Sequence, residues 1–510
     1  MDTLTVPVVI VGAGPTGATA AIELGLRGVE CLVLDRWEDV YPQPRAVHLD
    51  DEVHRLISHL GIGEQFSAIS RPGGGLRLLD RRLRVLGEFA REGVSETNGH
   101  PRANMFDQPD LEVLLRARMH EQASVSFRGG VVVTGAEQVA PGRVLVSFQD
   151  AGTGAPDSVE TEFVLGCDGA NSIVRDAIGS SLQDLGFEQR WLVIDVATTV
   201  DLQQWEGVHQ VCDTTRAATY MRIGDTRHRW EFQLLHDESA DDFTSPERLE
   251  PLLRPWIGRT PMDDLQVIRT AEYTFRAAIA DRWRAGRIFL LGDAAHLTPP
   301  FIGQGMGAGV RDAANLGWKI SGFLDGRLAA DVLDSYEPER SAHARTMIQL
   351  ARRIGVVMTG GGLVGDTLRR LVVPALNLSP VVRRQVTDST TPALAGSSWV
   401  SSERSDHLAG HLCPNPVVNG HRLDDLLGAS WALVTTQAPA PSLATMLAAR
   451  DCRVVAAVAG GDLTTWLTGA GAVAALVRPD RTVMASGSDV AALCTTVTTA
   501  IAPRPAKATA

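Results

Sequence analysis

The sequence is poor in cysteine and has no closely spaced cysteine pair. Only six cysteines occur among the 510 residues, and none forms a Cys-x-x-Cys motif. This excludes a disulfide-rich secreted scaffold and a dithiol redox site, and it favours reduced, mostly buried thiols in a cytoplasmic protein. A His-Glu-x-x-His motif and clusters of cysteine and histidine are also missing, so no metal site is predicted.

Long apolar runs and concentrated positive charge are missing as well. Residues 1–6 lack the basic stretch of a secretory signal. The apolar stretch 6–26 is interrupted by Pro15, several glycines and Glu23, so a strand, turn and helix explain it better than a membrane span. The formal net charge is −12. We therefore expect neither a membrane nor a nucleic acid as a partner.

A glycine-rich turn between two apolar strands is the first positive signal. Residues 8–11 form a β-branched run, residues 12–17 read Gly-Ala-Gly-Pro-Thr-Gly, and an alanine-rich helix follows. A second strand, 31–34, ends at Asp35, 23 residues after Gly12. Such glycines let backbone N–H groups approach a pyrophosphate at a helix N-terminus, and such an acid accepts from a ribose hydroxyl. The motif predicts a dinucleotide site without distinguishing NAD from FAD, and a turn without ligand is the alternative.

Two later segments place an aspartate directly after an apolar strand. Residues 163–175 contain Asp168, and residues 287–296 contain Asp293 ahead of a Pro-Pro-Phe-Ile-Gly-Gln-Gly-Met-Gly run. Either aspartate alone could merely cap a helix. From about residue 5 to 350, the combined motifs resemble the FAD-dependent aromatic-ring monooxygenases, the family of p-hydroxybenzoate hydroxylase. The stretch 44–52, Pro-Arg-Ala-Val-His-Leu-Asp-Asp-Glu, is most similar to the 3-(3-hydroxyphenyl)propionate hydroxylases.

The resemblance implies an α/β fold with a Rossmann-like FAD-binding domain and an inserted substrate-binding β-sheet domain, as in p-hydroxybenzoate hydroxylase. We expect the first FAD-binding part at residues 1–185, the substrate sheet at 186–280, and the second FAD-binding part with helices at 281–390. Residues 400–500 resemble a thioredoxin-like C-terminal domain without a redox cysteine pair, so a structural or dimer-related role is expected. Glycines at 360–362 predict a hinge, 387–405 a linker, and 502–510 a disordered tail.

The same resemblance implies a set of cofactor contacts. The residues expected around FAD are Gly12, Gly14, Pro15, Thr16, Gly17, Asp35, Arg36, Arg45, Gln108, Asp168, Asp293, Pro300, Gly303, Gly305, Met306 and Gly307. The first glycines would hold the pyrophosphate, Asp35 the adenosine ribose and Asp293 the ribityl chain. Amides from Gly305 to Gly307 would face the pyrimidine edge of the flavin, where Gly307 replaces an asparagine common in the family.

The chemistry follows from the flavin. Only one dinucleotide fingerprint is present, so NAD(P)H is expected to bind transiently as a co-substrate. In such enzymes reduced FAD reacts with O₂ to give a C4a-hydroperoxide, whose distal oxygen attacks an electron-rich ring, so no protein nucleophile is expected. The implied reaction is hydroxylation of a small phenolic substrate with NAD(P)H and O₂.

Four residues are candidates for the substrate side of the site. Strand alternation places Arg229 and Glu231 on one face, and the resemblance puts Arg229 beside the flavin and Glu231 where relatives have a substrate-contacting tyrosine. Pro300 matches a proline whose carbonyl lies beside the substrate ring. His48 would sit near the flavin and could relay a proton, or could be a packing or surface histidine. Trp230 is expected in the core.

Three other functions remain open from the sequence. A related flavin monooxygenase could epoxidise a polyketide or another natural product, or carry out a Baeyer–Villiger oxidation, and product analysis would show this. A non-catalytic flavin-binding protein would yield no hydroxylated product from any phenol. A dehydrogenase that uses only NAD would be colourless when purified. A homodimer is a further possibility.

Overall fold

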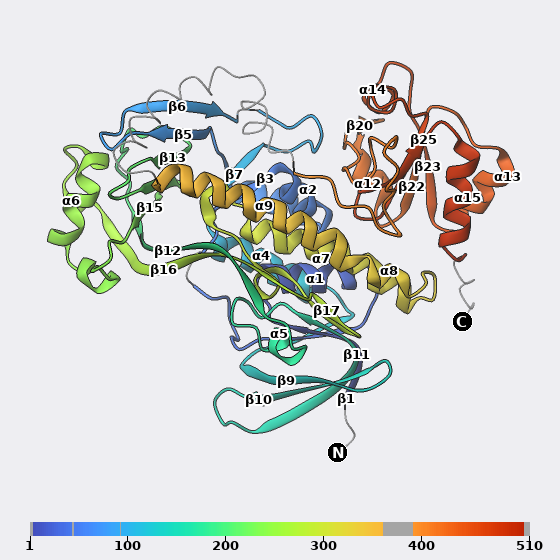
Figure 1. The fold of residues 1–510 in the computed structure, drawn as a ribbon, viewed down its shortest axis with the longest axis horizontal. Coiled ribbons are helices and arrows are strands. Elements are labelled where there is room, and N and C mark those ends of the chain that lie inside the picture. The colour runs from blue at the N-terminus through green and yellow to red at the C-terminus, as the bar shows by residue number, and fades with distance from the viewer. Residues whose placement is uncertain (1–3, 43–44, 92, 361–390, 504–510) are drawn as a thin grey trace.

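Two eight-stranded sheets and a separate four-stranded sheet organise the chain (Figure 1). The computed structural model describes residues 4–42, 45–91, 93–360 and 391–503. In spatial order the first sheet contains β17 (Arg284–Ala285), β18 (Ile288–Leu290), β11 (Pro156–Gly166), β1 (Leu4–Val11), β2 (Cys31–Leu34) and β8 (Val125–Arg128), and β10 (Arg143–Asp150) and β9 (Val131–Ala140) continue from β11. The strands from β18 to β8 are parallel, and β18, β2, the second half of β1 and the end of β11 are apolar, as expected for a sheet covered on both faces.

Helix α1 (Pro15–Gly25) contacts α4 (Gln108–His120) on one side and α7 (Gly305–Leu324) on the other. Its alanine-rich sequence allows this close packing. A Cβ at Gly17 would overlap the carbonyl oxygen of Gly12, so only glycine lets the helix start this close to its own turn. Helix α9 (Tyr336–Thr359) packs on α7 and crosses the molecule beside it (Figure 1).

The second sheet contains, in spatial order, β19 (His296–Leu297), β16 (Gln266–Ala280), β12 (Leu182–Ala197), β15 (Arg227–Gln233), β14 (Ala218–Arg222), β13 (Val208–Val211), β5 (Gly75–Leu79) and β6 (Val85–Ala90). Helix α6 (Pro246–Ile257) covers one face of it through a cluster that includes Tyr220, Trp230 and Trp256. Trp230 is fully buried in this cluster, so its expected core position is confirmed. Strands β5 and β6 come from the segment 1–185, so the chain enters this sheet twice.

Smaller elements connect the sheets. Strands β3 (His48–Asp50), β7 (Ala103–Met105) and β4 (Arg71–Pro72) form a three-stranded sheet. The helices nearby are α2 (Asp51–His59), α3 (Gly63–Ile69), α5 (Ile173–Ala177) and α8 (Asp331–Asp334), with 3₁₀ turns η1 (Ala240–Phe243), η2 (Met262–Asp264), η3 (Gly292–Ala294) and η4 (Pro300–Ile302). None of the helices in the described ranges is long and apolar enough to cross a membrane.

The C-terminal unit stands apart at the right of Figure 1. Its sheet runs β23 (Cys452–Ala456), β22 (Trp431–Thr435), β24 (Ala474–Val477) and β25 (Val483–Gly487), with only the β22–β23 pair parallel. The remaining elements of the unit are β20 (Val417–Val418), β21 (His421–Arg422), α12 (Leu423–Leu427), α13 (Pro441–Ala448), α14 (Asp462–Gly469) and α15 (Val490–Ala500). The thioredoxin-like fold of residues 400–500 and the domain boundaries given above stay predictions.

Aromatic and charged contacts fasten the C-terminal unit to α7 and α9. Trp399 is only 2% exposed, and its ring packs against Trp318 of α7 and Trp431 of β22. The described part of the expected linker, 391–405, is therefore anchored by an aromatic side chain. Residues 361–362, 387–390 and 504–510, on which the predicted hinge, part of the linker and most of the tail fall, lie outside the described residues. All six cysteines lie in the described residues, none of them forms a disulfide bond, and all are buried except for half-buried Cys167.

Candidate flavin and substrate site

The three glycine–aspartate motifs meet at one edge of the first sheet. Val11, Leu34, Gly166 and Leu290 end four neighbouring parallel strands and lie in register with one another. The loops that carry Asp35, Asp168 and Asp293 leave the sheet directly after these strand ends. The carboxyl edge of a parallel sheet is where such folds bind dinucleotides, so the sequence motifs converge on one place.

The first turn has the shape that a pyrophosphate needs. Gly12 has a positive φ of 99°, and a Cβ there would overlap the carbonyl oxygen of Cys167. Gly14, in contrast, has no atom within 4 Å of where its Cβ would be. Helix α1 starts at Pro15 without a side-chain cap and without an acid in its first turn. Its first amides therefore face open space, as an anion-binding helix N-terminus requires.

Thr16 brings the first and third motifs together. Its hydroxyl lies where a Cβ at Gly292 or Gly309 would be, so η3 and α7 can approach α1 only through these two glycines. Helix α7 starts at Gly305, again without a side-chain cap or an acid in its first turn. Two uncapped helix N-termini thus lie on elements that meet at Thr16, which fits a cofactor with a pyrophosphate and an electron-rich flavin edge.

The three aspartates differ in what they bind. The Asp35 carboxylate accepts from the backbone N–H of Ala13 at 2.5 Å and of Trp37 at 2.7 Å, which fixes the glycine turn. Asp168 accepts from the Ser172 hydroxyl at 2.6 Å and from the backbone N–H of Val174 at 3.1 Å, so it supports the first turn of α5, whose N-cap is Ser172. Asp293 is exposed and has no hydrogen-bond partner among the described residues. It is the aspartate best placed to accept from a ligand.

Protein surrounds Asp293, although its side chain reaches solvent. Enclosure by protein raises the pKa of its carboxyl group, against the opposing influence of His296 and Arg45, although the side chain is exposed. Arg45 lies close enough to Asp293 to act on its carboxyl group.

Replacing Asp293 with alanine is expected to weaken FAD binding about tenfold to a hundredfold, because a hydrogen bond to a charged group contributes about 1.5–3 kcal/mol. Titration of the apoprotein with FAD, followed by flavin fluorescence, measures this change. The matched control is Asp264→Ala, which removes an exposed carboxylate of η2 and should leave the affinity unchanged. Equal affinities of the two variants would contradict the role of Asp293.

Gln108 organises the segment around Arg45. Its amide oxygen accepts from the backbone N–H of Arg45 at 3.1 Å and of Ala46 at 2.5 Å, and its amide nitrogen donates to Glu112 at 2.7 Å. The side chains of Arg36 and Arg45 are exposed and therefore accessible to a ligand. Gln108 therefore acts at least in part by positioning its neighbours.

A buried polar cluster clamps the loop that should face the flavin. Gln304 donates to Asp50 at 2.8 Å, and Arg311 donates both to Asp50 at 2.6 Å and to Gln304 at 2.9 Å. The loop from Pro300 to Gly307 is thereby tied to the start of α2. Sequence reasoning missed this cluster, although a single arginine inside an apolar helix and three successive acids at 50–52 were a usable signal.

The glycine at position 307 has a packing reason. A Cβ there would lie 2.9 Å from a methyl group of Val53 and 3.0 Å from the guanidinium of Arg311. An asparagine at this place would push against both, so the local packing of α2 on α7 favours glycine. Neighbouring Met306 is half-buried against the main core.

His48 lies against the same loop. Gly303 has a positive φ of 63°, and a Cβ there would be 2.6 Å from the Nδ1 atom of His48. This nitrogen is buried and has no hydrogen-bond partner among the described residues. Burial, helped by the charge of Arg91, lowers the pKa of His48 to about 4, so the ring is neutral at pH 7. Both interpretations of His48, a proton relay and a packing residue, are compatible with this place.

The second sheet turns one face toward this loop. Arg229 donates to Asp195 at 2.7 and 3.0 Å and to the carbonyl oxygen of Arg45 at 3.0 Å. Gln210 donates to the carbonyl oxygen of Phe301, which belongs to the Pro300–Ile302 turn, at 3.0 Å. Glu231 shares this face, because Trp230 between it and Arg229 points to α6. The sequence missed Asp195 and Gln210, since no motif marks them.

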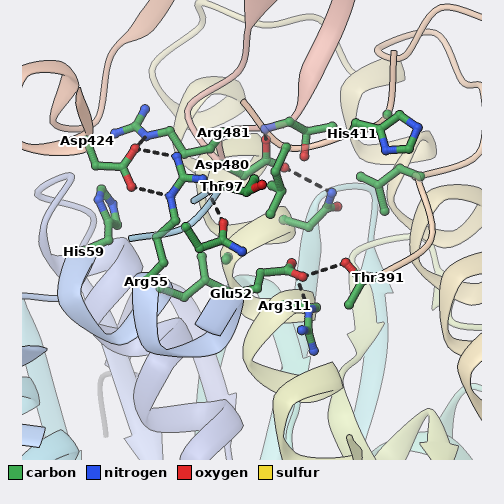
Figure 2. A pocket seen from close by; sticks show the side chains of 18 of the residues that line it. Glu52, Arg55, His59, Thr97, Arg311, Thr391, His411, Asp424, Asp480 and Arg481 are labelled. Atoms are coloured by element: carbon green, nitrogen blue, oxygen red, sulfur yellow. Dashed lines mark hydrogen bonds and ion pairs between the residues drawn. The ribbon is translucent and has the colours of Figure 1, made fainter. Parts of the chain in front are cut away.

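A cavity of about 370 Å³ lies elsewhere, between the C-terminal unit and helices α1, α2 and α7. Figure 2 shows its wall, where Arg55 and Arg481 both bind Asp424, and Glu52 binds Arg311 and Thr391. Each of the arginines that line it pairs with a carboxylate. The cavity is therefore a charge-balanced interface that joins the two units. Of the stretches described above, it is lined by Asp51 and Glu52 of 44–52 and by Arg311, and not by the glycine turn, Asp168 or Asp293.

Comparison with known proteins agrees with the geometry. A family model described as "FAD binding domain" matches residues 5–351. The chain is 31% identical over 530 aligned positions to a probable NADH-specific resorcinol 4-hydroxylase of Rhodococcus jostii (strain RHA1), covering 98% of this chain and 96% of that protein. It is 34% identical over 444 positions to a 3-(3-hydroxy-phenyl)propionate/3-hydroxycinnamic acid hydroxylase of Mycobacterium avium (strain 104), covering 84% and 76%.

Solved structures show the same fold. Aklavinone-11 hydroxylase in complex with FAD and aklavinone superimposes with a TM-score of 0.81 at 22% identity, over 98% of this chain and 99% of that one. OxyS anhydrotetracycline hydroxylase from Streptomyces rimosus gives 0.78 at 26% identity, over 98% and 100%. The expected α/β fold and its FAD-binding domain are confirmed. The chain therefore belongs to the FAD-dependent aromatic-ring monooxygenase family.

Proposed function

We propose that this FAD-dependent monooxygenase hydroxylates a small phenolic compound with NAD(P)H and O₂. The observation that carries the proposal is the meeting of two uncapped helices and the strand-end loops at one edge of the first sheet, next to a polar face of the second sheet. When bound, FAD would supply the redox chemistry and the activation of O₂. The protein would hold the cofactor through Gly12, Gly14 and Asp293, and would keep water from the reacting ring.

A phenol is the substrate class that the relatives support. The resorcinol hydroxylase matches over nearly the full length of both chains, and the hydroxyphenylpropionate hydroxylases match over most of this chain. All of these are named for phenolic substrates. In this chain Arg229 would lie beside the flavin, and Glu231, His48 and the Pro300 carbonyl would line the substrate side.

A second candidate rests on the solved structures. Aklavinone and anhydrotetracycline, named for two of the structural neighbours, are larger than simple phenols. A larger natural product is therefore the alternative substrate, whether hydroxylated or oxidised by epoxidation or Baeyer–Villiger chemistry. We further propose a cytoplasmic location. We also propose a homodimer, which gel filtration with light scattering would test.

The purified protein is expected to be yellow and to oxidise NADH or NADPH faster when a phenol is present. Oxidation should be followed with resorcinol, 3-(3-hydroxyphenyl)propionate and a panel of simple phenols, and products should be identified by mass spectrometry. A ring product with one additional oxygen would support the proposal. Yellow protein without stimulation by any phenol would refute the substrate class, and protein that cannot be reconstituted with FAD would refute the cofactor.

A further inference from the structure

Glu231 is a buried carboxyl group without a partner. It lies on β15, is 8% exposed, and has no hydrogen bond to any residue in the described ranges. Burying a carboxylate without a hydrogen bond is costly, so such groups are normally paired. Burial raises the pKa of Glu231 to about 7, although Arg229 lowers it. A group in this state is suited to a ligand that donates a hydrogen bond.

The row of residues that contains Glu231 leads to the flavin loop. Glu231 lies opposite Thr219 of β14, and Thr219 lies opposite Gln210 of β13. Residues in register on neighbouring strands point to the same face. The amide oxygen of Gln210 is buried and unpaired, while its nitrogen holds the carbonyl oxygen of Phe301. Two acceptors without donors thus share the face that meets the Pro300–Ile302 turn.

The charges around Glu231 are already balanced. Arg229 on the same strand and Arg269 on β16 both pair with Asp195 of β12, at 2.7 and 2.9 Å. The direct neighbours of Glu231 across the sheet, Val193 and Thr219, carry no charge. With Glu231 ionised, two arginines face two carboxylates and the net charge is zero. A carboxylate brought in by a substrate would make this buried group negative, which is unfavourable.

We propose that the carboxylate of Glu231 accepts the hydroxyl of an uncharged phenol and takes its proton as the ring is oxidised, so that the site selects neutral phenols over phenols that carry a carboxylate. The inference rests on the proposed phenol hydroxylation. In the step, the phenol O–H bond breaks and its proton forms the O–H bond of the Glu231 carboxylic acid. Its electron pair moves toward the ring, and a ring carbon would form a C–O bond to one oxygen atom of O₂. NAD(P)H, acting through FAD, would supply the two electrons that reduce the other oxygen atom to water. The unpaired oxygen of Gln210 accepts from a second hydroxyl.

The test compares the wild-type protein with Glu231→Gln and with Glu272→Gln. The second variant is a control that removes an exposed carboxylate on β16, which is separated from β15 by β12. Resorcinol and 3-(3-hydroxyphenyl)propionate serve as the neutral and the anionic probe. Product formation is measured as kcat from below to above pH 7, where Glu231 titrates. Binding of each probe without NAD(P)H is measured from the change in flavin absorbance, and FAD content is measured for every variant.

Wild-type kcat with resorcinol should rise with pH through about 7, because Glu231 becomes ionised. Glu231→Gln should lower this kcat about a hundredfold or more and remove the rise, since a general base contributes about 10²–10⁴-fold. The same variant should bind 3-(3-hydroxyphenyl)propionate about tenfold more tightly, because a like charge is removed. Glu231→Asp should restore part of the activity, and Glu272→Gln should behave as wild type.

Two results overturn the inference and leave phenol hydroxylation intact. One is a Glu231→Gln variant with unchanged kcat and pH profile, and the other is a wild-type protein that prefers the anionic probe above pH 7. A yellow wild-type protein that hydroxylates no phenol overturns the proposed function, and the role of Glu231 with it.

Discussion

Replacing Gly14 with glutamate is expected to weaken FAD binding by at least about a hundredfold, which corresponds to about 2.7 kcal/mol, and to abolish hydroxylation. The side chain would project into the open space beside the start of α1, where no atom lies within 4 Å of the Cβ position. It would bring a carboxylate to a helix N-terminus that should hold a pyrophosphate. The φ of Gly14 is −66°, so the backbone accepts the substitution. FAD content after purification and titration of the apoprotein measure the effect.

The chain offers a matched control for this variant. Gly135 lies in β9, also has no atom within 4 Å of its Cβ position, and has no positive φ. Gly135→Glu adds the same side chain and the same charge in β9, away from the glycine turn at residues 12–17, so this variant should retain FAD. If Gly14→Glu also purifies with full FAD content, the pyrophosphate does not bind at this turn.

Replacing Glu339 with glutamine is expected to lower the free energy of unfolding by about 3–5 kcal/mol, the usual cost of breaking a buried ion pair. Glu339 accepts from Lys319 at 2.8 Å, from Arg478 at 3.0 Å and from Ser397 at 2.7 Å, and the two cations are fully buried. Arg478 keeps Asp480, whereas Lys319 would lose its carboxylate partner. The Glu339–Arg478 pair joins α9 to the C-terminal unit. We therefore expect the lower free energy of unfolding to appear as a shift of the first unfolding transition in urea.

A surface pair provides the control. Glu250→Gln breaks the exposed ion pair with Arg254 on α6 and should cost less than about 1 kcal/mol. Burial would raise the pKa of Glu339, but Arg478 and Lys319 hold it well below its ordinary 4.5. Its contribution is therefore complete above that pH and is lost as the pH falls. The difference between wild type and Glu339→Gln should shrink on acidification, and a difference that grows would contradict this assignment.

The meeting of the three motifs at one edge of the first sheet was predictable because local sequence dictates it. Glycines such as Gly12 and Gly17 are needed where backbone meets backbone, and an acid after an apolar strand must emerge at the carboxyl edge of the sheet. The alternation at Arg229 and Glu231 also placed both on one face correctly, because a strand has a period of two. The sequence could not distinguish Asp168, which accepts from the first turn of α5, from Asp293, which has no hydrogen-bond partner among the described residues, since both aspartates follow an apolar strand.

The substrate half depends on contacts between distant segments, which no local pattern reveals. Asp195, which neutralises Arg229, and Gln210, which holds the Phe301 carbonyl, lie on strands that reach the site only through the pairing of the second sheet. The entry of β5 and β6 into that sheet, and the anchoring of the 391–405 stretch by Trp399, likewise arise from tertiary packing. Burial of a large aromatic side chain outweighed the polar, linker-like composition around it.

The most direct test of the account is a turnover with isotopically labelled O₂, NADH and resorcinol, followed by mass spectrometry of the ring product. Hydroxylation with O₂ predicts one labelled oxygen atom in the product for each NADH consumed in coupled turnover. An unlabelled product, or NADH consumption that yields only hydrogen peroxide with every phenol tested, would contradict the claim that this protein hydroxylates phenols.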